Sequence, residues 1–285
     1  MRSLATCLLL LAPIAARAAL PPAAAAPAQF ELGIGALAMV LPDYRGSDYY
    51  GPRVLPIPYV SYRSERLQLT REGLRARLFS SENVTASFSG AGSLPGADDN
   101  PDRAGMPRLD PTFELGPSLD VMLVDGEGDA PRLKLRVPVR AVIAADGFDL
   151  KHIGWTTVPH LRVDVGQTFE TYHVSHLFSA GLAWSTEDYH EYFYGVAPEF
   201  TDPAIGRLAY DAGGGYSGLR ASASSTIRFG KLRVGGFASY DYLGGAAFAD
   251  SSLVKTDHAL TAGVFVTYRL YESGGHAAPL EGEAE

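Results

Sequence analysis

The sequence predicts an all-β protein, an antiparallel up-and-down transmembrane β-barrel of about ten strands, with twelve strands as the alternative count. Three observations predict this fold: an export signal at the amino terminus, long segments in which apolar and polar residues alternate, and short connections that alternate with long polar ones. Together they indicate a chain that is exported and crosses a bacterial outer membrane with strands.

The amino terminus has the three parts of a secretory signal peptide. Arg2 is cationic, residues 8–14 form a short apolar core, and Ala16-Arg17-Ala18 has the small-x-small pattern that signal peptidase cleaves. The apolar core is too short to cross a bilayer as a helix. We therefore expect residues 1–18 to be a signal peptide and residues 19–29, rich in alanine and proline, to be a flexible lead-in.

Composition excludes several classes of function. The 24 lysines and arginines are outnumbered by 32 aspartates and glutamates, and this balance argues against a nucleic-acid partner. Cys7 is the only cysteine and would leave with the signal peptide, which excludes disulfides and thiol chemistry from the mature chain. We expect residues 30–271 to form the barrel and residues 272–285 to be an acidic periplasmic tail.

The alternation is clearest in the segment 131–145. Apolar residues from Leu133 to Ile143 occupy every second position, and cations occupy most positions between them. A period of two is typical of a strand and not of a helix. The same pattern recurs in 160–165, 231–242 and 260–270. A soluble β-sandwich also alternates, but its strands are usually about five or six residues long, whereas a tilted transmembrane strand needs about 9–11.

The connections predict the strand boundaries. Strands are expected near 30–40, 56–69, 73–93, 111–124, 131–145, 155–165, 172–185, 210–228, 231–243 and 258–271. Long external loops are expected at 41–56, 94–110, 146–154, 186–209 and 244–257, and short periplasmic turns at 125–130, 166–171 and 229–231. If 73–93 divides at Ser81-Glu82-Asn83, the arrangement has twelve strands.

The polar faces of these strands predict a charged lumen. Its expected cations are Arg132, Lys134, Arg136, Arg140, Arg162, Arg220, Lys231, Arg233 and Arg269, and its expected anions are Glu114, Asp120, Asp164 and Asp241. Four cations on one strand repel one another, so Glu114 and Asp120 on the preceding strand are the expected partners. About ten strands leave only a narrow lumen. The set fits a structural ion-pair network, a small anion-selective path or an occluded ligand site.

No motif predicts an enzyme, a cofactor or a metal site. His173 and His176 fall on opposite faces of a strand, and no spacing joins any histidine to a nucleophile and an orienting acid. Gly33-Ile34-Gly35 lacks the strand-then-helix context of a dinucleotide loop. The segment 125–129 is too short for a calcium loop and is read as a turn. The sequence therefore predicts a protein that is not an enzyme.

Six segments in order carry a resemblance to a known family. They are Pro42-Asp43-Tyr44-Arg45-Gly46-Ser47, Pro56-Ile57-Pro58-Tyr59-Val60-Ser61-Tyr62-Arg63, Arg103-Ala104-Gly105-Met106-Pro107, Glu114-Leu115-Gly116-Pro117-Ser118, Tyr194-Gly195-Val196 and Tyr210-Asp211-Ala212-Gly213-Gly214-Gly215. With these segments the chain resembles the MipA/OmpV family of outer-membrane proteins, named for an MltA-interacting protein. The resemblance spans nearly the whole chain after the lead-in.

The resemblance implies a scaffold in the outer membrane. Family members look like adaptors that hold a lytic transglycosylase near a bifunctional murein synthase, so the implied partners are these two enzymes, the lipid bilayer and lipopolysaccharide. Other members are described as adhesins or as envelope proteins that respond to stress. The family attaches no catalytic set to these segments, so no catalytic residue is carried over to this chain.

Overall fold

The computed structural model describes residues 29–64, 67–70, 73–94, 100–126 and 129–273. The expected signal peptide, the lead-in up to residue 28 and the tail from residue 274 lie outside the described residues. Within them, antiparallel strands dominate, and one α-helix lies between two of the strands. Among the described residues, no helix is long and apolar enough to cross a membrane.

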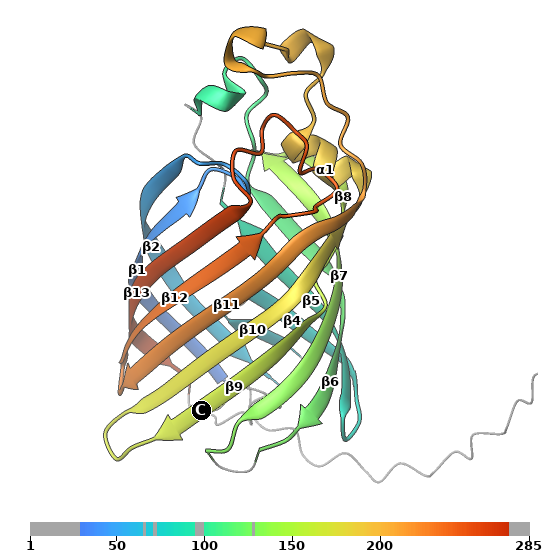
Figure 1. Ribbon diagram of the computed structural model, residues 1–285. Coiled ribbons are helices and arrows are strands. Elements are labelled where there is room, and N and C mark those ends of the chain that lie inside the picture. Colours follow the sequence, from blue (N-terminus) through green and yellow to red (C-terminus); the bar gives the residue numbers. More distant parts are fainter. Residues whose placement is uncertain (1–28, 65–66, 71–72, 95–99, 127–128, 274–285) are drawn as a thin grey trace, which may run out of the picture.

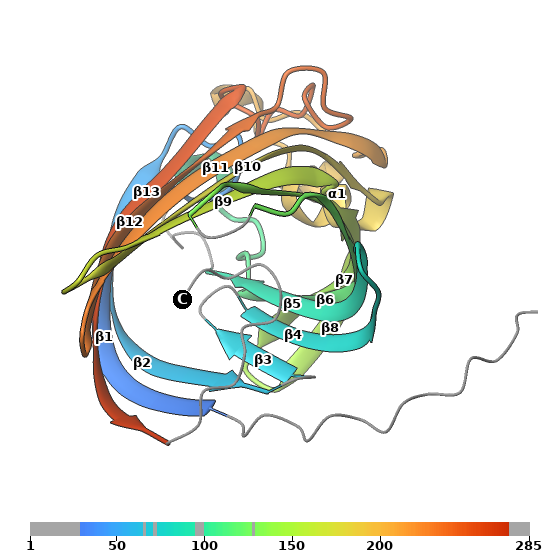
Figure 2. The ribbon, with the colours of Figure 1, turned by 90° about the horizontal axis from the view of Figure 1, so that it is seen from below.

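The strands form one closed barrel (Figures 1 and 2). The described strands are β1 (Gln29–Pro42), β2 (Tyr50–Arg63), β3 (Leu67–Thr70), β4 (Gly73–Ser80), β5 (Val84–Ser93), β6 (Thr112–Val124), β7 (Arg132–Asp146), β8 (Asp149–Thr157), β9 (His160–Thr168), β10 (His173–Ser185), β11 (Gly215–Phe229), β12 (Leu232–Tyr242) and β13 (His258–Glu272). Each strand pairs with the next around the ring, and β13 pairs with β1; the pairing of β2 with the short β3 covers only Tyr62 and Arg63. Pairing between neighbouring strands satisfies backbone groups that lipid could not satisfy.

The strands β8 and β9 together occupy one position in the ring, between β7 and β10. The upper half of β7 pairs with β8 and its lower half pairs with β9, while β10 pairs with both. The break falls at Val158 and Pro159, and a proline has no backbone N–H to donate to a neighbouring strand. The described chain therefore has twelve strand positions, which is the alternative count and not ten.

Several expected boundaries were wrong. The expected strand 73–93 divides at residues 81–83 into β4 and β5, and the short β3 precedes it. The expected loop 146–154 does not exist, because Asp146 pairs with Asp149 across a tight turn in which Gly147 has φ +62°. Asp-Gly is a hairpin signal, and it was the clue to this turn. The strand expected at 210–228 begins at Gly215.

The outward face of the barrel is apolar. Ile34 on β1, Val54 on β2 and Val264 on β13 are 61%, 75% and 61% exposed, and each alternates with residues that point into the lumen. Trp155, Trp184, Tyr240 and Tyr268 are also exposed. An apolar belt with exposed aromatic residues is what a bilayer requires of an outer-membrane barrel.

The long loops fold together at one end of the barrel, opposite the end with the short turns (Figure 1). We call this end external, because long loops of outer-membrane barrels face outward and short turns face the periplasm. Helix α1 (Glu187–Tyr194) lies there. Glu187 and Asp188 are in its first turn, where their negative charges stabilise the helix by interacting with the positive end of its dipole.

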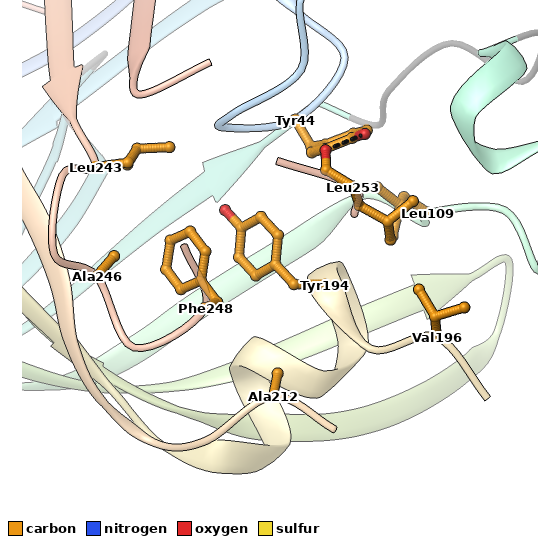
Figure 3. Packing of buried hydrophobic residues seen from close by; sticks show 9 residues of the cluster. All are labelled: Tyr44, Leu109, Tyr194, Val196, Ala212, Leu243, Ala246, Phe248 and Leu253. Carbon is orange, nitrogen blue, oxygen red and sulfur yellow. Dashed lines mark hydrogen bonds between the residues drawn. The ribbon is translucent and has the colours of Figure 1, made fainter. Parts of the chain in front are cut away.

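The external loops share a hydrophobic core, which we call the loop cap (Figure 3). Its buried residues are Tyr44, Leu109, Tyr194, Val196, Ala212, Leu243, Ala246, Phe248 and Leu253. They come from four connections: β1–β2, β5–β6, β10–β11 and β12–β13. Tyr194 and Phe248 stack with ring centroids 3.7 Å apart. The loops are therefore a packed layer held by the burial of aromatic side chains.

Candidate functional site

The inner wall formed by β6 and β7 carries paired charges. Arg136 donates to Asp120 through Nε at 2.9 Å and through Nη2 at 2.8 Å. Arg140 donates from Nη1 to Glu114 Oε2 at 3.2 Å. Each pair joins the two adjacent strands, and in both the side chains are at most 21% exposed. A two-point contact between a guanidinium and a carboxylate fixes the geometry as well as neutralising the charge.

The next strand continues this wall. On β9, Arg162 Nη2 lies 2.8 Å from Asp164 Oδ1, and both side chains are at most 10% exposed. Lys134 on β7 is 4% exposed, beside Arg162 in the pairing of β7 with β9. Arg132, nearer the short-turn end, lies 3.6 Å from Asp125. The wall therefore places most of its cations beside carboxylates on the same or the next strand.

One predicted lumen residue lies elsewhere. Lys231 is in the turn between β11 and β12, its side chain is exposed, and its carbonyl accepts a hydrogen bond from the Arg269 N–H. The prediction that it faces the lumen was wrong, because the alternation was extended one residue past the start of β12 at Leu232. A cation at an exposed turn keeps its hydration, which a lumen position would have reduced.

Asp241 on β12 has two arginine partners. Arg220 on β11 and Arg45 in the β1–β2 connection each lie 2.9 Å from its Oδ1. Arg45 also donates to the carbonyl of Ser217 at 2.6 Å. Arg45 was not among the predicted site residues, since a loop residue shows no alternation. It links the loop cap to the charged inner wall.

A second unpredicted cluster surrounds Glu31 near the periplasmic end, where β1 meets β13. Glu31 is 1% exposed, and it accepts from Arg233 at 3.1 Å and from Arg269 at 3.4 Å. The hydroxyl of Tyr59 donates to it as well, and Arg63 lies 4.0 Å away. Arg233 and Arg269 were predicted to face the lumen, whereas the carboxylate between them was missed. The sequence did hold a signal for Glu31. This residue alternates with Phe30, Leu32 and Ile34 along β1, so it lies on the face opposite to theirs.

Segments that are distant in the sequence meet in the loop cap. The rings of Tyr44 and Tyr194 pack edge to face, with centroids 6.3 Å apart. The Tyr194 hydroxyl donates to the carbonyl of Arg45 at 3.0 Å, and Arg103 Nη1 donates to the carbonyl of Phe193 at 2.9 Å. Three of the six resembling segments, at 42–47, 103–107 and 194–196, therefore pack against one another.

The loop cap contains a serine–histidine contact that sequence reasoning did not find. His190 Nε2 lies 2.5 Å from Ser217 Oγ, and His190 Nδ1 lies 2.6 Å from the carbonyl of Gly213. A nucleophile and its base make such a contact, but a substrate must reach both. Ser217 and His190 are each 0% exposed, and Ser217 also contacts Ser185 at 3.1 Å. The contact therefore joins α1 to β11 as part of the packing.

Acid is expected to loosen the loop cap through His190. Burial lowers the pKa of His190 below its usual value of 6.5, the carbonyl of Gly213 opposes this shift, and the charge of Arg45 adds to it. In an opened cap the imidazole titrates near pH 6.5, so cap stability is fully present above that pH. It falls as the pH drops from about 6.5 through the lowered pKa of the closed state, by about 1.4 kcal/mol per pH unit.

Hydrogen exchange of the amides in 187–194 checks this expectation. Exchange is expected to speed up between pH 7.5 and pH 5.5, after correction for the intrinsic effect of pH, and the acceleration should be absent in His190→Gln. The exposed His258 gives the matched control, because His258→Gln should keep the full pH dependence. An unchanged pH dependence in His190→Gln would place the titrating group elsewhere.

Within the described ranges, no group of three or more His, Cys, Asp or Glu side chains is arranged to hold a metal ion. Of the six described histidines, five lie on strands and His190 lies on α1. His173, on β10, contacts Thr168 at 2.9 Å, whereas His176 stacks on Phe178 with centroids 6.5 Å apart.

A closed antiparallel barrel with an apolar belt, a charged interior and packed external loops defines an outer-membrane β-barrel protein. The model of the family described as MltA-interacting protein MipA matches residues 34–270, and the chain belongs to this family. The protein is accordingly an outer-membrane barrel in contact with the lipid bilayer.

Solved outer-membrane proteins that are similar to this chain include the following three. The outer-membrane protease OmpT of Escherichia coli is 10% identical, with 86% of this chain and 97% of that chain covered and a TM-score of 0.30. OmpT of Vibrio cholerae is 9% identical, with coverages of 88% and 99% and a TM-score of 0.29. The toluene transporter TbuX of Ralstonia pickettii is 11% identical, with coverages of 86% and 90% and a TM-score of 0.28. At these TM-scores the likenesses have no bearing on this chain's function. No curated protein matches the chain.

Proposed function

We propose that this protein is a non-enzymatic scaffold of the outer membrane, exported by its signal peptide, which binds murein-processing enzymes at its periplasmic face. The observation that carries the proposal is membership of a family named for its interaction with MltA. A lytic transglycosylase of that kind is the first expected partner, and a bifunctional murein synthase is the second.

Two structural observations support a role without catalysis or conduction. The serine and histidine in contact are both fully buried, so no substrate reaches them. At the external end, α1 packs onto the inner wall, where Val142 and Ala144 lie against Tyr189 and Phe193. An aromatic layer against the wall narrows the route that an ion would need, since crossing such a layer strips its hydration.

The periplasmic face offers short turns as contact surface. The described turns β4–β5, β9–β10 and β11–β12 contain no helix or strand, and they lie beside the periplasmic end of the charged lumen. An adaptor with such turns binds through small exposed patches and through the acidic tail, which lies outside the described residues. Contacts of this size suit a transient complex.

Site-specific crosslinking tests the proposal. A photoreactive residue replaces Glu170, which is exposed in the short turn between β9 and β10, and a second one replaces Glu199, which is exposed in the external loops. Illumination of intact cells should join the Glu170 variant to a lytic transglycosylase or a murein synthase, identified by mass spectrometry. The Glu199 variant is the matched control and should yield neither enzyme.

Absence of both enzymes from the Glu170 products, and from those of equivalent probes in the other short turns, would contradict the scaffold. Steady ion conductance of the purified protein in planar bilayers would instead support the narrow anion-selective channel.

A further inference from the structure

A small polar hollow lies in the inner wall where β4, β5, β6 and β7 meet. Its rim includes Glu82 and Asn83 of the short turn between β4 and β5, so it opens in the periplasmic half of the barrel. Arg75, Arg77 and Lys134 bring three cationic side chains to its lining.

Two donors in this hollow have no hydrogen-bond partner among the described residues. The hydroxyl of Ser87, a residue that is 1% exposed, is one of them, and Nε of Arg77 is the other. The two residues pair directly across β4 and β5 and both line the hollow. A buried donor without an acceptor costs about 1–3 kcal/mol. Two such donors side by side therefore mark a place suited to an acceptor.

The charge of the hollow favours an anionic acceptor. Of its two carboxylates, Asp120 is already engaged by Nε and Nη2 of Arg136, which is not itself part of the lining. The other, Glu82, is exposed at the rim. The lining therefore holds three cations and two carboxylates, and its net charge is positive. In this partly desolvated wall, a bound anion would offset the mutual repulsion of the cations.

We propose that this hollow is a binding site for a phosphate-type oxyanion that enters from the periplasmic side. Such an anion offers several acceptor oxygens, which match arginine N–H groups and the hydroxyls of Ser87 and Thr85. Entry from the short-turn end follows because α1 packs against the inner wall at the other end. Free phosphate and the phosphoryl headgroup of an anionic lipid share this chemistry. The site is independent of the scaffold role, and either can fail without the other.

Calorimetric titration of the full-length protein with inorganic phosphate, in an uncharged detergent at low ionic strength, tests the site. Saturable binding at one site is expected. Arg77→Gln should weaken it about ten-fold or more, because a hydrogen bond to a charged group contributes about 1.5–3 kcal/mol. Ser87→Ala should weaken it about three-fold without lowering the unfolding temperature, because the Ser87 hydroxyl has no partner among the described residues to lose.

Two matched controls separate the hollow from the rest of the charged wall. Arg132→Gln removes another inward arginine of the same half, one that lies near Asp125 and outside the hollow. Ser89→Ala removes the neighbouring inward hydroxyl of β5, which contacts Arg140 at 3.3 Å. Both variants should bind phosphate with affinities close to that of the unchanged protein.

A second arm identifies the source of the oxyanion. If phosphatidylglycerol added to the micelles suppresses the phosphate titration in the unchanged protein, a lipid headgroup occupies the site. If it does not, the ligand is free phosphate. Absence of saturable phosphate binding both with and without this lipid would overturn the proposal, as would unchanged affinity in both Arg77→Gln and Ser87→Ala.

Discussion

Replacing Glu31 by glutamine is expected to destabilise the barrel by about 3–5 kcal/mol, the usual cost of removing one partner from a buried charge cluster. The carboxylate of Glu31 is the shared acceptor of Arg233 and Arg269, with Arg63 4.0 Å away. Without its charge, these arginines on β2, β12 and β13 repel one another across the seam at which β1 closes the ring. The barrel should open first at that seam.

The measurement is the temperature at which the folded, faster-migrating form disappears on gels without boiling, together with urea unfolding followed by tryptophan fluorescence. Glu272→Gln is the control, because Glu272 also contacts Arg269, at 2.8 Å, but its side chain is 36% exposed. An exposed pair contributes about 0–1 kcal/mol. Equal stability of the two variants would show that burial of Glu31 does not set the strength of the cluster.

Alternation along the strands carried most of the fold prediction. In segments such as 131–145 and 258–271, every second residue is apolar over at least five positions, as a long strand with one face toward lipid requires. The count of strands was less accessible. β3 has four residues, and β8 and β9 are separated by only two, so neither feature produces a pattern long enough to recognise.

The charged lumen could be predicted in part for the same reason. Asp120 and Arg136 stand on the adjacent strands β6 and β7, in which apolar and polar residues alternate. Their positions in that alternation are enough to predict that both side chains face the lumen. Arg45 and His190 stand in the connections between strands, where the strand alternation does not extend, and their partners lie at least 23 residues away in the sequence. Contacts of this kind depend on how four loops fold over one another, which follows from tertiary packing and not from local pattern.

The hollow behind Ser87 was also beyond sequence reasoning. Serines alternate along β5 and β11 alike, and nothing in the sequence distinguishes Ser87 from Ser89. The difference appears only in three dimensions, since the hydroxyl of Ser89 contacts Arg140 and that of Ser87 has no partner among the described residues.

Replacing Gly154 by valine is expected to release α1 from the inner wall. Gly154 on β8 has φ +121°, and a Cβ there would lie 2.4 Å from Thr186 Oγ1 and 2.7 Å from the backbone nitrogen of Tyr189. The backbone strain alone costs about 1–3 kcal/mol. The close approach also breaks the hydrogen bond of 3.0 Å from the Trp155 N–H to Thr186 Oγ1, which fixes the start of the helix.

Release of α1 should expose a buried aromatic layer while leaving the barrel intact. Tyr189, Tyr192 and Phe193 pack on the lumen-facing Val142, so the strands below retain their own pairing when the helix moves away. Cleavage by a glutamate-specific protease at Glu187 and Glu191 should therefore accelerate at least ten-fold in the purified variant, because an opening cost of about 1.4 kcal/mol corresponds to one factor of ten. Heat-modifiable migration of the uncleaved protein should persist.

Gly147→Val separates close approach from strain. Gly147 has φ +62°, and a Cβ there would meet nothing within 4 Å, so this variant carries a strained turn without touching α1. Its cleavage at Glu187 and Glu191 should stay near that of the unchanged protein. If both glycine variants are cleaved at the same rate, the attachment of α1 does not depend on the narrow space at Gly154. The helix would then be held mainly by Tyr194, which stacks on Phe248 at the far side of the loop cap.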